Sequence, residues 1–403
     1  TSPGPTGRST PRRCGRTTRS SSPPAGGGLR SSRSELLAAL TAVKRTVAVA
    51  GSHGKTSVSA LLAWILAAAG QRPSYAIGGD ALDLPGNGAW AEGEWLVAEA
   101  DESDGSFRRL TPSWEAIVNI DLDHVDRYPT WEAISAAFAS FIERIPPSGG
   151  LVAWGDDPRL RTLLPSSRRV VLYGEGEGAS VRAREIQLSP ASTAFRVEKD
   201  GKELGEVRLG IWGRHNALNA LAALAFALEI GVPFAAAAAA LGRFRGVRRR
   251  LMPVARGAAL VVEDYSHHPA EVAAALAALR PAVPGRLWCV FQPHRYSRLE
   301  RFAPDLAAAL LAADRILLVE VYPAFETPRP GVSSALLLKE LAARGRSDAL
   351  LLGPAEIAPL LAAAAEKGDG IVVMGAGDVG SLAPRIAGEL KGRFPEMETG
   401  SPA

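Results

Sequence analysis

Residues 47–57 read Val-Ala-Val-Ala-Gly-Ser-His-Gly-Lys-Thr-Ser. The first four residues favour a short apolar strand, and the apolar residues that follow Ser57 favour a helix. A glycine loop between a strand and a helix directs backbone N–H groups and the helix N-terminus at a phosphate. We therefore predict that Gly51, Gly54 and Ser57 belong to a nucleotide phosphate-binding loop, the alternative being a plain strand-to-helix turn.

The side chains of this loop have separate expected roles. Lys55 would bring a positive charge to the outer phosphates, and Thr56 would offer a hydroxyl to Mg²⁺. The loop is shorter than the common phosphate-binding loop, which has a glycine where this chain has Val49. His53 stands inside the shortened loop, and we assign it to the same nucleotide site.

The short loop and five further segments together resemble the Mur ligases, which build the peptide part of bacterial cell-wall precursors. Within that family they are most similar to the ligase that joins L-alanine to UDP-N-acetylmuramate. The resemblance runs from about residue 34 to the C-terminus, and the order of the six segments is more specific than any one of them. The segments are GSHGKT at 51–56, EADESDGSF at 99–107, NIDLDH at 119–124, GRHNALNA at 213–220, DYSHHP at 264–269 and FQPHRYSR at 291–298.

Two of these segments predict metal ligands. Glu99 ends an apolar strand pattern, and a carboxylate at a strand end beside a phosphate loop is well placed to hold Mg²⁺. The resemblance implies that Glu99 binds this ion together with Thr56, and that His124 binds a second one. The plainer interpretations are a solvated acidic loop for Glu99 and a surface or core histidine for His124.

The resemblance also implies which residues hold the rest of the nucleotide. His215, Asn216 and Asn219 lie close together on a predicted helix, on the adenine and ribose side of ATP, with Asp264 from the next motif. Helix N-capping by Asn216 is the competing explanation. Among the arginines at 248–250, the family pattern favours Arg250 as the one that reaches the γ-phosphate, while a solvated linker is the alternative.

An amino-acid site is predicted in the last third of the chain. Arg295 and Arg298 follow an apolar strand pattern, and pairs of arginines bind carboxylates through bidentate hydrogen bonds. The resemblance implies that both hold the carboxylate of the incoming amino acid and that Tyr265 and His267 line the same site. His267 is also a weak candidate for the general base, and a surface salt-bridge pair is the alternative for the arginines.

Composition limits the classes of partner. The chain has 403 residues, of which 47% are apolar and 22% charged, as in ordinary globular proteins. Residues 1–34 hold seven arginines and no acid, which leaves 39 basic residues against 42 acidic ones in the remainder. We therefore expect no nucleic-acid partner. The absence of an 18-residue apolar run predicts no membrane insertion, and the two cysteines, with Cys289 in a core strand pattern, suit the cytoplasm.

Alternating strand and helix patterns predict an α/β fold with two domains after a tail. Residues 34–244 would form a central P-loop-type ATP-binding domain with a mostly parallel sheet, and residues 245–403 a doubly wound Rossmann-like domain. We expect antiparallel additions at 181–209 and a linker at 242–250. The predicted strands are 46–50, 95–98, 116–120, 151–154, 258–262, 287–291, 316–321, 349–352 and 371–374, and the predicted helices 35–43, 130–144, 216–231, 270–279, 306–313 and 336–343.

The tail at 1–33 is rich in Arg, Ser, Pro and Gly, and we expect it to be disordered. A transit peptide and an out-of-frame translation are the other interpretations of this stretch. Near the C-terminus, Gly375-Ala376-Gly377-Asp378-Val379-Gly380 looks like a dinucleotide fingerprint. Because no long βαβ unit follows it, we expect a structural turn near the nucleotide instead of an NAD site.

The activity implied by the resemblance is ATP-dependent amide formation through an acyl phosphate, with UDP-N-acetylmuramate and L-alanine as substrates. Two alternatives stay open: a recycling ligase that attaches a murein tripeptide to the same sugar nucleotide, and a non-catalytic ATP-binding remnant. Related ligases begin with a Rossmann-like domain whose glycine loop holds the UDP pyrophosphate, and no such pattern precedes Ser34. We therefore expect little or no ligase activity from this chain.

Overall fold

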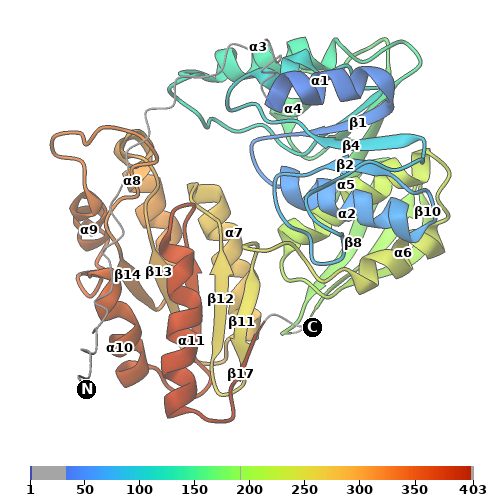
Figure 1. Cartoon of the computed structure of the whole chain (residues 1–403). Coiled ribbons are helices and arrows are strands. Elements are labelled where there is room, and N and C mark those ends of the chain that lie inside the picture. Colours follow the sequence, from blue (N-terminus) through green and yellow to red (C-terminus); the bar gives the residue numbers. More distant parts are fainter. Residues whose placement is uncertain (2–32, 191, 401–403) are drawn as a thin grey trace.

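The computed structural model describes residue 1 and residues 33–190 and 192–400. In that part of the chain two α/β units lie side by side, one in blue to green and one in yellow to red (Figure 1). The tail predicted at 1–33 falls almost wholly outside the described residues. Over the described ranges, no helix has both the length and the apolar character that crossing a bilayer requires.

The larger sheet contains ten strands, all from residues 45–209. They are β1 (Arg45–Ala50), β2 (Ser74–Ala76), β3 (Gly88–Ala89), β4 (Trp95–Glu99), β5 (Trp114–Ile117), β6 (Gly150–Trp154), β7 (Arg169–Gly174), β8 (Val181–Leu188), β9 (Thr193–Lys199) and β10 (Lys202–Leu209). Their order is β10-β9-β8-β7-β6-β5-β1-β4-β2-β3. Neighbours from β8 to β2 are parallel, whereas β8–β9, β9–β10 and β2–β3 are antiparallel. This confirms a mostly parallel sheet with antiparallel additions at 181–209.

The smaller sheet contains seven strands, in the order β15-β14-β13-β16-β12-β11-β17. They are β11 (Met252–Arg256), β12 (Leu260–Asp264), β13 (Leu287–Phe291), β14 (Arg315–Leu318), β15 (Leu350–Leu351), β16 (Gly370–Met374) and β17 (Glu398–Thr399). The strands from β15 to β12 are parallel, and β11 pairs antiparallel with both of its neighbours. Cys289 is fully buried in β13, which confirms its predicted place in the core.

Helices cover both faces of each sheet, as parallel strands require. They are α1 (Arg33–Val43), α2 (Lys55–Ala68), α3 (Trp131–Ile142), α4 (Pro158–Arg161), α5 (Arg214–Glu229), α6 (Phe234–Arg243), α7 (Pro269–Leu279), α8 (Tyr296–Leu310), α9 (Ser334–Ala343), α10 (Pro354–Ala364) and α11 (Leu382–Arg393), with 3-10 turns at Ser106–Arg109, Arg280–Ala282 and Val379–Ser381. On the larger sheet α2, α5 and α6 lie on one face and α1, α3 and α4 on the other (Figure 1). On the smaller sheet α7–α9 and α10–α11 divide in the same way.

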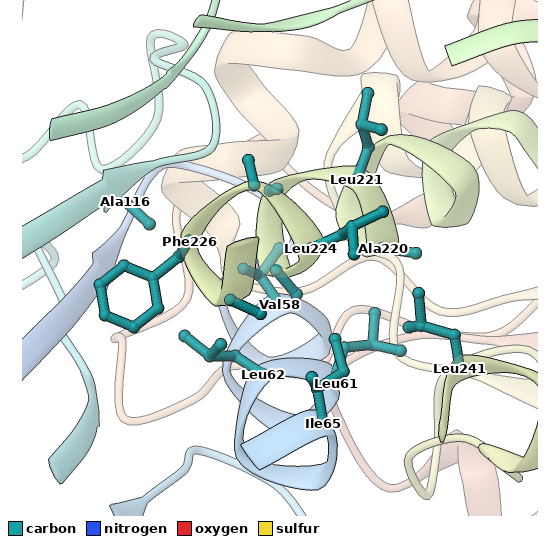
Figure 2. Close-up of a cluster of buried hydrophobic side chains, with 14 of the residues drawn as sticks. Val58, Leu61, Leu62, Ile65, Ala116, Ala220, Leu221, Leu224, Phe226 and Leu241 are labelled. Atoms are coloured by element: carbon teal, nitrogen blue, oxygen red, sulfur yellow. The ribbon is translucent and has the colours of Figure 1, made fainter. Parts of the chain in front are cut away.

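The packing of α2 against α5 positions the phosphate loop. Leu61, Leu62 and Ile65 of α2 are fully buried, and so are Leu224 and Phe226 of α5. Figure 2 shows Leu224 above Val58 between the two helices, Leu61 directed toward Leu241 of α6, and Phe226 directed toward Ala116 of β5. Each buried leucine or phenylalanine contributes roughly 1.5–3 kcal/mol to the free energy of folding. This packing therefore fixes the position of the first turn of α2 relative to that of α5.

Several predicted boundaries were wrong for physical reasons. α8 begins at Tyr296, ten residues before the predicted start at 306, because Leu299, Phe302 and Leu306 share a buried helical face despite the charges between them. β5 ends at Ile117 and not at 120, because the next residues pair with the start of the irregular phosphate loop: Ser52 N–H donates to the Asn119 carbonyl. α6 runs to Arg243 and so overlaps the predicted linker at 242–250, while β2, β3 and β7 were not predicted.

Glu115 supplies a pH-dependent test of the core. Its side chain is fully buried on β5, and neither carboxyl oxygen has a hydrogen-bond partner within the described ranges. Burial raises its pKa well above the usual 4.5, and the charge of Arg144 offsets only part of this rise. The folded chain therefore keeps a proton that the unfolded chain loses, so stability falls as pH rises from about 4.5 to the folded pKa.

We expect Glu115→Gln to match the unaltered chain in stability near about pH 4 and to exceed it near about pH 8. The gain in free energy of unfolding should be about 1.4 kcal/mol for each unit by which folding raises the pKa of Glu115. Urea unfolding at both pH values measures it. A gain of equal size at both pH values would contradict the assignment of a buried, protonated carboxyl.

Candidate active site

The phosphate loop has the predicted form, and its shape requires glycine at two positions. Gly54 has φ +81° and directly precedes α2. A Cβ on Gly54 would lie 2.7 Å from the side-chain oxygen of Asn219, and one on Gly51 would lie 3.0 Å from the backbone of Asn119. Asn119 also accepts a hydrogen bond from the His53 N–H at 2.8 Å. The loop is therefore held against the residues that follow β5, and it leads directly into α2.

Lys55 already has a carboxylate partner. Its Nζ donates to both carboxyl oxygens of Glu102, at 2.8 and 3.0 Å, and to the Gly51 carbonyl at 2.7 Å. Glu102 is fully buried. Burial alone would lower the pKa of Lys55, but Glu102 and Asp101 outweigh it, so the pKa lies above its ordinary value and the ammonium keeps its charge. Sequence reasoning did not single out Glu102 among the four acids at 99–104.

The two residues predicted to share a magnesium ion lie together. Thr56 Oγ1 donates to Glu99 Oε1 at 3.1 Å, while Glu99 Oε2 accepts from the backbone N–H of Gly78 at 2.7 Å. A hydroxyl and a carboxylate oxygen at the end of a phosphate loop are ligands of the type that Mg²⁺ prefers. The donor set thus fits the predicted ion.

His124 lies in the same cavity but beside different acids. Its Nε2 is 3.4 Å from Glu102 Oε1, and Asp101, Glu102 and His124 bring their donor atoms within 4.8 Å of one another. One imidazole and two carboxylates can hold a divalent ion. This group corresponds in position to the predicted second metal site, with Asp101 and Glu102 as additional donors.

A smaller cavity of about 140 Å³ takes in the residues predicted for the adenine side. Asn219 donates to Asn216 Oδ1 at 3.2 Å, and Asn216 donates to the Trp212 carbonyl at 2.7 Å. The alternative that Asn216 caps the helix is wrong, because the capping position belongs to Gly213. The predicted residues that line this cavity are His53, Gly54, Ser57, His215, Asn216, Asn219, Arg250 and Asp264.

Burial in this smaller cavity shifts the pKa values of His215 and Asp264. Burial, together with the charge of Arg250, lowers the pKa of His215 to about 4, so the ring is neutral near pH 7. Burial raises the pKa of Asp264, whose oxygens accept from the N–H groups of Leu251 at 2.7 Å and Ser266 at 2.8 Å. Asp264 therefore fixes the backbone directly after Arg250.

The neighbouring arginines at 248–250 make different contacts in the structure. Arg249 donates to the carbonyls of Gly375 and Gly377, both at 3.0 Å, and pairs with Glu263. The guanidinium of Arg250 lies 5.0 Å from the ring of Tyr265 and forms no ion pair within 4.0 Å among the described residues, although its charge acts on Asp264 and Glu271. Arg249 thus anchors the glycine turn at 375–380, as predicted for a structural turn. That turn borders neither cavity over the described residues, so its predicted closeness to the nucleotide finds no support.

The predicted amino-acid site lies in a cavity of about 740 Å³. Arg298 is buried, donating to Asp123 Oδ1 at 2.8 Å, while Arg295 is 36% exposed and 4.0 Å from Asp126. Burial lowers the pKa of His267 to about 4. The predicted residues that line the cavity are Gly54, Lys55, Thr56, Glu99, His124, Arg250, Tyr265, His267, Arg295 and Arg298.

His53 joins the two α/β units. Its Nδ1 is 3.3 Å from Glu271 Oε1 on α7, and its Nε2 is 3.5 Å from Asp121 Oδ2 after β5. Burial alone would lower the pKa of His53, but the two carboxylates raise it to about 9, so the ring is charged near pH 7. Gly54, Arg250 and Glu271 border both cavities, and these therefore meet between the units. Glu271 and Asp123, like Glu102, escaped sequence reasoning because no local pattern marks them.

Comparisons with known proteins agree with this arrangement. Residues 49–227 match the Mur ligase middle domain, and residues 248–377 match the domain described as "Mur ligase, glutamate ligase domain". A UDP-N-acetylmuramate–L-alanine ligase of Kineococcus radiotolerans is 44% identical over 367 residues, or 90% of this chain and 78% of the relative. The chain belongs to the Mur ligase family. All predicted site residues of this Mur ligase fall inside the two matched ranges.

Two further relatives extend the comparison. A relative in Anaeromyxobacter sp. (strain Fw109-5), also named UDP-N-acetylmuramate–L-alanine ligase, is 40% identical over 89% of this chain and 79% of the relative. The crystal structure of the UDP-N-acetylmuramate-alanine ligase of Thermotoga maritima has a TM-score of 0.73 at 26% identity. It covers 87% of this chain and 76% of the other. The predicted α/β fold class, with a central and a C-terminal unit, is confirmed.

Proposed function

We propose that this Mur ligase joins L-alanine to the lactyl carboxylate of UDP-N-acetylmuramate, with ATP and Mg²⁺. One observation carries the proposal: a single cavity brings together the phosphate-loop lysine, the Thr56–Glu99 pair and the arginines Arg295 and Arg298. Such a cavity can hold a triphosphate terminus and an amino-acid carboxylate close together. The relatives that are 40% and 44% identical are named for this reaction.

The chain's own residues supply positioning and charge compensation. Lys55 would face the β- and γ-phosphates, Thr56 and Glu99 would hold the magnesium ion, and Arg250 would approach from the C-terminal unit. The lactyl carboxylate attacks the γ-phosphorus of ATP to give an acyl phosphate, and ADP leaves. The amine of L-alanine, which loses a proton to solvent, then attacks the acyl carbon and expels phosphate. Bound magnesium would neutralise charge on the transferring group. Fixed positive charges act most strongly in a site from which water is excluded.

At the amino-acid end, the two arginines orient the carboxylate of L-alanine. Arg298 is held by Asp123 and by His294, whose Nδ1 lies 3.3 Å from Arg298 Nη1. His267 lines the same cavity with a neutral ring, but a base with a pKa of about 4 takes a proton poorly from an ammonium group. We therefore assign His267 to orienting the amino acid rather than to proton removal. The reaction belongs in the cytoplasm, without a nucleic-acid partner.

The decisive experiment supplies the purified chain with ATP, Mg²⁺ and high UDP-N-acetylmuramate, and compares L-alanine, glycine, L-serine and the murein tripeptide as acceptors. Phosphate release together with a labelled amide product, greatest with L-alanine, supports the proposal, and robust product formation would contradict the expectation of little or no activity. Product with the tripeptide alone would instead favour the recycling ligase. ATP binding without phosphate release for any acceptor would favour a non-catalytic nucleotide-binding protein.

Arg295 offers a test of the amino-acid site at small structural cost. We expect Arg295→Gln to raise the KM for L-alanine about 10–100-fold, because a charge-assisted contact to a carboxylate contributes roughly 1.5–3 kcal/mol. The KM for ATP and the free energy of unfolding should change little, since this side chain is 36% exposed. Arg301→Gln, an exposed change on the same helix, is the control. Equal KM values for L-alanine in both variants would contradict the assignment.

A further inference from the structure

A group of metal-binding side chains lies apart from the predicted magnesium ligands. His53, Asp121 and His268 each offer a donor atom, and these three atoms lie within 4.8 Å of one another. The ring centroids of His53 and His268 are 4.6 Å apart. The residues come from the phosphate loop, from the segment after β5 and from the residue that precedes α7. The group therefore spans both α/β units.

His268 gives a second, independent indication of a ligand. Its residue is only 4% exposed, yet neither ring nitrogen has a hydrogen-bond partner among the described residues. A buried imidazole without a partner costs about 1–3 kcal/mol, so the site is incomplete as it stands. Its ring faces His53 on one side and packs edge-on against Phe302 at 5.0 Å on the other. A ring nitrogen of His268 that has no hydrogen-bond partner thus lies close to the donor atoms of His53 and Asp121.

We infer that His53, Asp121 and His268 form a zinc site that links the phosphate loop to the start of α7. Two imidazoles and one carboxylate are a donor set that Zn²⁺ favours, whereas Mg²⁺ prefers oxygen ligands alone. With metal–ligand bonds of about 2.0–2.2 Å, the donors of one zinc ion lie roughly 3–3.5 Å apart. The present spacing therefore needs only small side-chain movements. Glu271, 3.3 Å from His53 Nδ1, can orient that ring. On binding, zinc would replace the proton that the His53 ring carries in the metal-free chain.

The test measures zinc binding directly and does not depend on the ligase reaction. Untagged, metal-free protein is titrated with Zn²⁺ in competition with a chromophoric chelator. We expect one site that His268→Gln weakens at least about 10–100-fold, and that Asp121→Asn also weakens. The unaltered chain should melt at a higher temperature with zinc, because a ligand that binds only the folded state stabilises it, and His268→Gln should lose that shift.

Two control variants separate this site from other histidines. His294→Gln makes the same chemical change outside the group and should leave zinc affinity unaltered. His124→Gln removes the imidazole of the Asp101–Glu102–His124 group, which is the other set of metal-binding donors among the described residues. Zinc binding that His124→Gln abolishes and His268→Gln spares would overturn the inference.

A spectroscopic measurement on the unaltered chain tests the zinc site even if the variants do not fold. X-ray absorption of the unaltered, zinc-loaded chain should show two imidazole ligands. The alternative group at His124 contains a single imidazole, so a spectrum with one or none would also overturn the inference.

Discussion

Replacing Arg250 by methionine is expected to lower ATP-dependent phosphate release by about 10³–10⁵-fold, the range found when an arginine that stabilises a transferring phosphoryl group is removed. Arg250 borders both cavities, lies where the chain passes from one unit to the other and has no carboxylate within ion-pair distance over the described ranges. It is thus free to meet the γ-phosphate. Single-turnover phosphate release, under conditions in which the unaltered chain reacts, measures the effect.

Arg249→Met is the matched control, since it makes the same change one residue away. Arg249 holds the carbonyls of Gly375 and Gly377, so its loss should reduce the free energy of unfolding and affect turnover far less. If the two variants lost turnover equally while both stayed folded, the distinction between the neighbouring arginines would be wrong.

Replacing Lys55 by methionine is expected to weaken ATP binding about 10–100-fold and to slow turnover by a further 10²–10³-fold or so. The physical reason is the loss of the charge nearest the phosphates, combined with a new imbalance: Glu102 stays fully buried without the ammonium at 2.8 Å that now compensates it. Equilibrium binding of a labelled nucleotide gives the first quantity without requiring turnover.

Lys339→Met, an exposed lysine on α9, removes the same charge far from the phosphate loop and should leave both quantities unchanged. Nucleotide affinity that is identical in the Lys55 and Lys339 variants would show that the loop does not bind phosphate.

The fold could be predicted wherever local chemistry decides it. A strand of small apolar residues, two glycines and an apolar helix specify the phosphate loop within a dozen positions, and β13 and β16 are similarly continuous apolar runs. The start of α8 was missed because Arg298, Glu300 and Arg301 interrupt the apolar pattern, although Leu299 and Phe302 keep the helical spacing. Helical periodicity, and not mean apolar content, was the signal to follow there.

Only those site residues that belong to a recognisable sequence motif could be predicted. Lys55, Thr56 and Glu99 lie where their motifs placed them, but Glu102 looks in sequence like any acid of its loop. Its burial against Lys55 results from two strands that are adjacent only in space, β1 and β4. Long-range pairing of this kind, like that of Asp123 with Arg298, leaves no local pattern.

Two of the cations that are expected to receive substrates are thus occupied by resident anions: Lys55 by Glu102, and Arg298 by Asp123. A substrate anion that binds Lys55 or Arg298 must consequently replace the carboxylate already paired with it. The affinity for that substrate then reflects the difference in free energy between the new ion pair and the one it replaces. A monovalent ion such as chloride gains little from such an exchange, because it replaces a carboxylate already at hydrogen-bonding distance. A triphosphate gains much more, since several charges act together. The ligand-free protein therefore stays electrically balanced at both positions, and small anions of the cell are poor competitors for them.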